Sequence, residues 1–264
     1  MLLRLATAAV GIPLLAAAIW FGNPWFAILL SVIALAAGWE FLNLPRRADV
    51  RPLRLFGLLG VLLFTLNGLG LTGTDYTWPL LSAVVALSLL LLLLRGPAEG
   101  AAVGWAWTLA GILYVGWTLG HAARLEMRPD GPGWLLFLLL TTFSVDSAAF
   151  LVGRAWGRRR LAPAISPGKT WEGAFAGFVA GVAVAPVLGV LLALPLSIAE
   201  GLGLGAGMAV LAQLGDLAES LLKRSVGVKD AGVLVPGHGG VLDRYDSIVF
   251  PLLLVYYYVV LFKG

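Results

Sequence analysis

The chain consists largely of apolar stretches of about 20 residues, the length that an α-helix needs to cross the hydrocarbon core of a bilayer. Short clusters of Pro, Gly and charged residues separate these stretches. Only 12% of the 264 residues are charged, whereas about 25% is usual in soluble domains. The pattern therefore predicts an all-α, polytopic integral membrane protein.

Breaking the sequence at the polar clusters predicts about nine transmembrane helices. The boundary between the seventh and eighth depends on Pro195 alone. The first apolar run leads into the second without a small-residue cleavage site, so we expect a retained first helix rather than a signal peptide. We divide the chain into 1–132, with helices one to five, and 133–264, with helices six to nine and the polar loops. The predicted spans are 5–21, 25–44, 53–72, 78–94, 101–121, 133–153, 171–194, 196–219 and 246–262.

The distribution of basic residues predicts the orientation. With nine spans, all but three of the 18 Lys and Arg residues lie on the side of the N-terminus. The positive-inside rule makes that side cytoplasmic. The same rule explains the pI of about 9.6, so no nucleic-acid partner is expected. The absence of cysteine excludes disulfides and thiol-ligated metals. Glycines in the fifth, seventh and eighth spans suit close helix packing.

Residues 220–246 form the densest polar segment of the chain. Charge beside a bilayer is costly and so marks a candidate functional site. Cations suit a polyphosphate, and carboxylates suit Mg²⁺ that bridges phosphate oxygens. The charged residues of this segment are Lys223, Arg224, Lys229, Asp230, Asp243, Arg244 and Asp246.

Two sets of carboxylates lie at the two ends of this segment. Asp216, Glu219, Ser220 and Lys223 have the spacing i, i+3, i+4 and i+7, which puts them on one helical face. Asp243 and Asp246 have the spacing i, i+3 where the last span begins. Together they predict a site for one or two Mg²⁺ ions. The alternatives are an intrahelical ion pair for Glu219 and Lys223, and helix capping for Asp243.

The sequence Pro236-Gly237-His238-Gly239-Gly240 lies between the two sets. Its glycines allow backbone N–H groups to approach phosphate oxygens closely. His238 is suited to donate to a phosphate or to shuttle a proton, with an ordinary hydrogen-bonding role as the alternative. His121, at a span end on the outer side, is interpreted as structural.

A second polar cluster lies upstream. Asp146 interrupts the sixth span, where a carboxylate must be paired, protonated or liganding. In the loop that follows, Ser166 and Pro167 predict a helix start, with Lys169 beside it as an anion site. Residues 168–170 have the sequence Gly-Lys-Thr, as at the end of the P-loop motif G-x-x-x-x-G-K-[ST]. Pro163 occupies the place of the first glycine of that motif, so the chain does not contain it here. Arg158, Arg159 and Arg160 are interpreted as topology determinants and lipid-phosphate contacts.

Both clusters resemble the phosphatidate cytidylyltransferase (CDP-diacylglycerol synthase) family. Residues 220–246 resemble its signature, and residues 166–173 resemble its Ser-Pro-x-Lys-Thr-x-Glu-Gly region. The resemblance implies transfer of the cytidylyl group of CTP to phosphatidic acid, giving CDP-diacylglycerol and pyrophosphate in phospholipid biosynthesis. It also implies Mg²⁺ (one or two ions, with an added monovalent cation left open), a bacterial inner membrane and a cytoplasmic active site. The oligomeric state stays open, with a homodimer as one candidate.

The resemblance assigns roles to individual residues. The expected catalytic residues are Asp216, Asp243, Asp246, Lys223, Lys229 and His238. The expected metal ligands are Asp146, Asp216, Glu219, Asp243 and Asp246. The expected substrate contacts are Ser166, Lys169, Lys223, Arg224, Lys229, Asp230, Gly237, His238, Gly239, Gly240 and Arg244.

Three other functions fit the sequence less well. A transporter also places carboxylates in spans, but no convincing repeat relates the two halves. A CDP-alcohol phosphotransferase would need the pattern D-G-x-x-A-R…G-x-x-x-D-x-x-x-D, which is absent. A purely structural membrane protein would not keep so many charges in two short loops.

Overall fold

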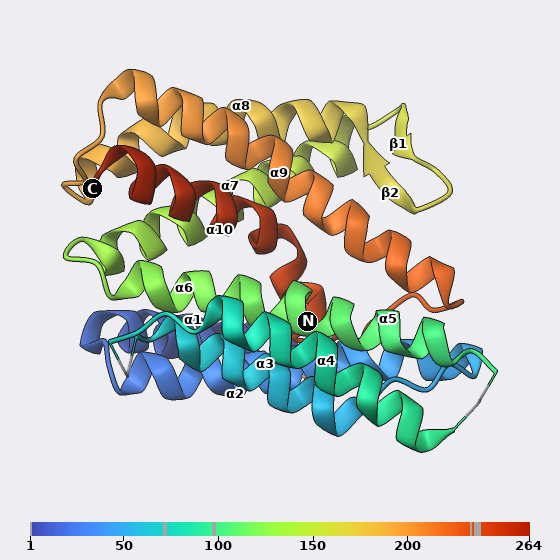
Figure 1. The fold of residues 1–264 in the computed structure, drawn as a ribbon. Coiled ribbons are helices and arrows are strands. Elements are labelled where there is room, and N and C mark those ends of the chain that lie inside the picture. The colour runs from blue at the N-terminus through green and yellow to red at the C-terminus, as the bar shows by residue number, and fades with distance from the viewer. Residues whose placement is uncertain (1, 71–72, 97–98, 233, 235–238) are drawn as a thin grey trace. The chain divides into compact units, whose positions relative to one another are not determined.

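The computed structural model describes the chain except for residues 1, 71–72, 97–98, 233 and 235–238, and it is helical apart from one short hairpin (Figure 1). The predicted all-α class is thus confirmed. The helices are α1 (Leu2–Phe21), α2 (Trp25–Asn43), η1 (Leu44–Ala48), α3 (Arg54–Gly68), α4 (Thr77–Arg95), α5 (Ala101–Gly111), η2 (Ile112–Trp117), α6 (Thr118–Glu126), α7 (Gly131–Trp156), α8 (Trp171–Leu191), α9 (Ile198–Ser225) and α10 (Leu242–Phe262).

Each predicted span contains a helix, with α5, η2 and α6 forming one continuous span. Among the described residues, seven helices are long and apolar enough to cross a membrane, and the apolar helices Ala9–Phe21 and Arg54–Gly68 are shorter. The break expected at Pro195 is real, because α8 ends at Leu191 and α9 begins at Ile198. Nine crossings and a cytoplasmic N-terminus stay predictions.

The helix surfaces support a membrane environment. On α4, Leu93 and Leu94 are 75% and 74% exposed, and only Val84 and Ser88 of this helix are buried. Soluble monomers rarely expose a continuous apolar face of this kind. Lipid is the solvent that such a face suits, so the chain is an integral membrane protein.

The described chain divides into two compact units. The first comprises residues 1–127 and 225–243, and the second comprises residues 128–224 and 244–264. In the first unit, α3 packs against α2, η2 and α6. The division predicted between residues 132 and 133, which separates the first five spans from the last four, stays a prediction.

In the second unit, α7 and α8 pack side by side, and α8 also contacts α9 through glycines (Figure 1). A Cβ added at Gly181 would lie 2.8 Å from the carbonyl oxygen of Gly205, so only a residue without a side chain allows this approach. The predicted packing role of glycines in these spans is confirmed at this contact.

The segment between α7 and α8 corrects one prediction. Residues Arg160–Ala162 (β1) and Ser166–Thr170 (β2) form an antiparallel hairpin, so Ser166 does not start a helix. Instead Thr170 caps α8, because its hydroxyl oxygen accepts the N–H of Gly173 at 3.2 Å. Ser and Thr are both good N-caps, and strand pairing of residues 166–170 decides between them.

Candidate active site

The end of α9 presents the predicted polar face. Lys223 Nζ lies 2.9 Å from Glu219 Oε2, and Ser220 Oγ donates to Asp216 Oδ1 at 3.3 Å. Glu219 is fully buried and Lys223 is 7% exposed. The ion pair that the sequence offered as an alternative for these two residues is therefore present. A buried pair of this kind compensates each charge for the water it has lost.

The β1–β2 hairpin contacts the same part of α9. Lys169 Nζ of β2 lies 2.8 Å from Asp216 Oδ2 and also donates to the carbonyl oxygen of Gln213 at 3.4 Å. Arg224 Nε donates to the carbonyl oxygen of Ile165 at 3.2 Å. Glu172 of α8 accepts the backbone N–H groups at the start of the hairpin. These contacts bring two predicted phosphate ligands, Lys169 and Arg224, to one end of α9.

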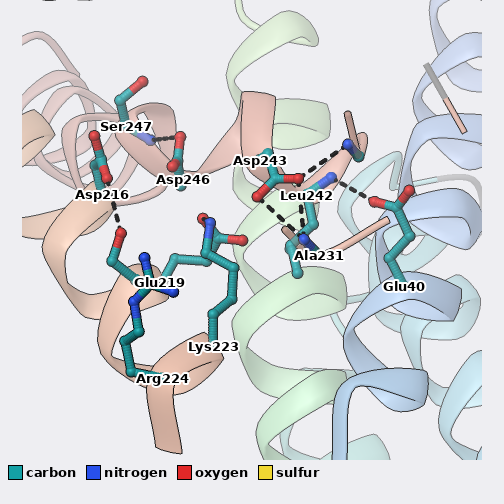
Figure 2. A network of polar contacts seen from close by, with 12 residues as sticks. Glu40, Asp216, Glu219, Lys223, Arg224, Ala231, Leu242, Asp243, Asp246 and Ser247 are labelled. Atoms are coloured by element: carbon teal, nitrogen blue, oxygen red, sulfur yellow. Dashed lines mark hydrogen bonds and ion pairs between the residues drawn. The ribbon is translucent and has the colours of Figure 1, made fainter. Parts of the chain in front are cut away.

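Asp246 brings a third carboxylate to this group from the first turns of α10. Its side chain is 8% exposed, interacts with the charge of Asp216 and shares a hydrogen bond with Glu219. Ser247 N–H donates to Asp246 Oδ1 at 2.7 Å (Figure 2). Two carboxyl groups in contact need either a shared proton or a cation. The crowding of Asp216, Glu219 and Asp246 therefore suits either a shared proton or a bound cation.

Asp146 of α7 is linked to the same turn of α10. Ser247 Oγ donates to Asp146 Oδ2 at 2.8 Å, and Asp146 also interacts electrostatically with Asp216, Lys169 and Arg244. Asp146 thus shares a polar environment with Asp216. Sequence reasoning missed Ser247, although its place directly after Asp246 in the polar signature was a usable signal.

The first unit contains three further charged residues of the predicted set. Asp243 accepts backbone N–H groups of Ala231 at 3.1 Å and Gly240 at 2.9 Å (Figure 2). These bonds hold the backbone that precedes α10, and both predicted roles of Asp243, as a metal ligand and as a cap of the last helix, stay predictions. Lys229 and Asp230 are exposed, as phosphate contacts need to be.

The other predicted residues differ in their surroundings. Ser166 is half-buried within β2, whereas Arg244 is exposed on α10 and interacts electrostatically with Asp146. Gly239 has a φ of +89°, a conformation that a non-glycine residue rarely adopts. Gly237 and His238 lie outside the described residues, so their predicted roles stay predictions.

The side chains present suit a hard cation in their chemistry. Carboxylate oxygens are the ligands that Mg²⁺ prefers, and Asp216, Glu219 and Asp246 supply them from two helices. Over the described part of the chain, no three His, Cys, Asp or Glu residues already form a metal-binding group. The donor types therefore fit Mg²⁺, while its binding stays a prediction.

Sequence similarity to known proteins adds to the evidence from the carboxylates and cations described above. Residues 2–262 match the model of the cytidylyltransferase family. The chain belongs to the cytidylyltransferase family. The family predicted from the sequence is thus confirmed, and with it the assignment of the protein to the nucleotidyltransferases. Membership also separates the chain from the transporters and CDP-alcohol phosphotransferases that its composition left open.

Individual relatives agree with the family match. The chain is 35% identical over 252 residues to a phosphatidate cytidylyltransferase of Brucella suis, covering 92% of this chain and 87% of the relative. It is 33% identical over 243 residues to the phosphatidate cytidylyltransferase of Bacillus subtilis, covering 90% of each. Both similarities extend over about nine tenths of the chain. The family match, over residues 2–262, includes both compact units and both polar clusters.

Proposed function

We propose that this protein transfers the cytidylyl group of CTP to phosphatidic acid, yielding CDP-diacylglycerol and pyrophosphate. The similarity to phosphatidate cytidylyltransferases over about nine tenths of the chain supports CTP and phosphatidic acid as the substrates. The observation that carries the chemistry is the group formed by the buried Glu219 and Asp246 and the partly exposed Asp216, with Lys169 and Lys223 beside it. We further propose that the site faces the cytoplasm of a bacterial inner membrane, where CTP is available.

The reaction needs positioning more than it needs a base. An oxygen of the lipid phosphate forms a bond to the α-phosphorus of CTP, and the bond between that phosphorus and the bridging oxygen of pyrophosphate breaks. Because the attacking phosphate is already anionic, no strong general base is required. The main barrier is the approach of two anions, which cations on the protein lower.

The residues of the second unit suit that task. Lys169 and Arg224 carry positive charge at the end of α9, where they would attract the phosphates of CTP. Asp216, Glu219 and Asp246, with Asp146 nearby, would hold Mg²⁺. When bound, Mg²⁺ would neutralise phosphate oxygens and stabilise the leaving pyrophosphate. Lys223 orients Glu219 through their ion pair.

The proposal is tested with purified protein in lipid nanodiscs. We expect pyrophosphate release that requires CTP, phosphatidic acid and Mg²⁺ together. Diacylglycerol in place of phosphatidic acid should give no release, because it lacks the attacking phosphate. Equal release with water as the only acceptor would indicate a CTP hydrolase and would contradict the proposal.

A further inference from the structure

Glu40 is a buried carboxylate that sequence reasoning did not single out. It lies in the last turn of α2 and is 3% exposed. A charged side chain in a candidate transmembrane helix is costly unless a partner compensates it. Its partner therefore indicates what the residue does.

That partner is the backbone leading into α10. Glu40 Oε2 accepts the N–H of Leu242 at 2.9 Å, and the amides of Leu234 and Val241 also stabilise the carboxylate (Figure 2). All of these residues belong to the first unit. A helix N-terminus is usually capped by a residue next to it in sequence, whereas this acceptor comes from 202 residues away.

The backbone around Glu40 is shaped to admit its side chain. A Cβ added at Gly240 would lie 2.6 Å from Oε2, and one added at Gly232 would overlap Oε1. Both glycines belong to the described part of the segment between α9 and α10, residues 226–232, 234 and 239–241, which we call the loop. Asp243 holds the same loop through the N–H groups of Ala231 and Gly240. Two carboxylates thus fix the end of this loop.

We propose that Glu40 is a positioning residue, which anchors the described parts of this loop so that Lys229 and Asp243 keep the orientation that the site needs. This inference rests on the proposed function. Glu40 contacts the loop backbone and acts through it rather than touching the substrate.

The first test compares Glu40→Ala and Glu40→Gln with Glu126→Gln. Glu126 is a matched control, since it is also buried in the first unit but pairs with Asn23 at 2.8 Å. Hydrogen exchange of loop peptides and steady-state kinetics are measured. We expect Glu40→Ala to speed loop exchange and to lower kcat about 10- to 100-fold, because a charge-assisted bond to the backbone is lost.

Glu40→Gln should give an intermediate result, because its amide oxygen still accepts the Leu242 N–H without the charge. Glu126→Gln should leave loop exchange unchanged. Normal loop exchange and normal kcat in both Glu40 variants would overturn the proposal. A lower melting temperature with unchanged loop exchange would also overturn it, since that would indicate helix packing alone.

A double-mutant cycle with Gly232→Ala tests the contact itself. Alone, this substitution should speed loop exchange and lower kcat at least about tenfold, because the new methyl group overlaps the carboxylate. In the Glu40→Ala background, it should cause little further change. Gly203→Ala is the control, since a Cβ at Gly203 meets nothing within 4 Å. Independent, multiplying effects of the two substitutions would contradict the contact.

The exchange measurements need no turnover, so the two proposals fail separately. Faster loop exchange in the Glu40 variants, with a wild-type protein that does not convert CTP and phosphatidic acid, would support the anchoring and overturn the substrate assignment. An active wild-type protein with unchanged loop exchange in the Glu40 variants would support the substrate assignment and overturn the anchoring.

Discussion

Asp246 shows most clearly how a residue can serve the site at a cost to the fold. It is nearly buried and lies beside Glu219 and Asp216, so like charges oppose one another there. Such repulsion is tolerated where a cation is to be bound. The arrangement predicts opposite effects on stability and activity when one charge is removed.

We predict that Asp246→Asn lowers activity at least about 100-fold, because losing a metal carboxylate removes several kcal/mol of transition-state stabilisation. Without Mg²⁺, its melting temperature should equal or exceed that of the wild type. Mg²⁺ should stabilise the wild type, by about 2.7 kcal/mol at a concentration 100 times its Kd, but not the variant. A Mg²⁺-dependent shift that persists in Asp246→Asn would remove this residue from the metal site. The same test applies to Asp216→Asn and Asp243→Asn.

Asp146 is tested through its bond to Ser247. Asp146→Asn keeps an oxygen that accepts the Ser247 hydroxyl, so the fold should be retained while kcat falls. Ser247→Ala removes the bond and should cost about 1 kcal/mol of stability, with a smaller loss of activity. Wild-type rates and Mg²⁺ dependence in Asp146→Asn would show that Asp146 serves helix packing only.

Single residues also mark the limit of sequence reasoning. Asp146, Asp216 and Asp246 were identifiable because a charge within or beside an apolar run is conspicuous. Glu40 was not, because it lies near the end of a span, where a charged residue is expected at the membrane surface. Only the tertiary structure shows that its side chain turns inward to the backbone at Leu242.

At the scale of the elements, the hairpin between α7 and α8 makes two contacts that separate substitutions can test. Thr170 caps α8, and Lys169 joins β2 to α9 through Asp216. We predict that Thr170→Ala costs about 1 kcal/mol of stability and that Thr170→Ser restores it, as measured by thermal unfolding. Equal stability of all three proteins would contradict the cap.

Lys169→Ala should instead lower kcat/KM with little change in stability, because its ion pair is partly exposed and such pairs contribute less than about 1 kcal/mol. Lys169→Arg should restore activity only in part, since a planar guanidinium does not replace a compact ammonium. Arg124→Ala is the control, because it breaks an ion pair with Asp75 in the other unit. Full rescue by arginine would make Lys169 a nonspecific membrane charge.

The helices were predictable and the hairpin was not, for one physical reason. Apolar runs of bilayer length leave the backbone no alternative to internal hydrogen bonding, so every predicted span contains a helix. Residues 166 and 167 carry a helix-start signal, and no strand was predicted for them. The hairpin forms through the pairing of Arg160 with Thr170, which no local pattern reports.

For the whole molecule, the topology is testable because the chain has no cysteine. Ala164→Cys and Asp130→Cys place single thiols at exposed positions at opposite ends of α7. We predict that a membrane-impermeant maleimide labels Asp130→Cys from the outside and Ala164→Cys only after the membrane is opened. Labelling of both from the same side would contradict the nine-span orientation.

The central claim is that this molecule joins a cytidylyl group to a lipid phosphate in the membrane. Its most direct test follows CTP labelled with ³²P at the α or the γ position, with purified wild-type protein, phosphatidic acid and Mg²⁺. We predict that the α label enters the lipid phase as CDP-diacylglycerol and that the γ label is released as pyrophosphate in equal amount. An α label that stays in the aqueous phase, or a γ label that enters the lipid, would contradict it.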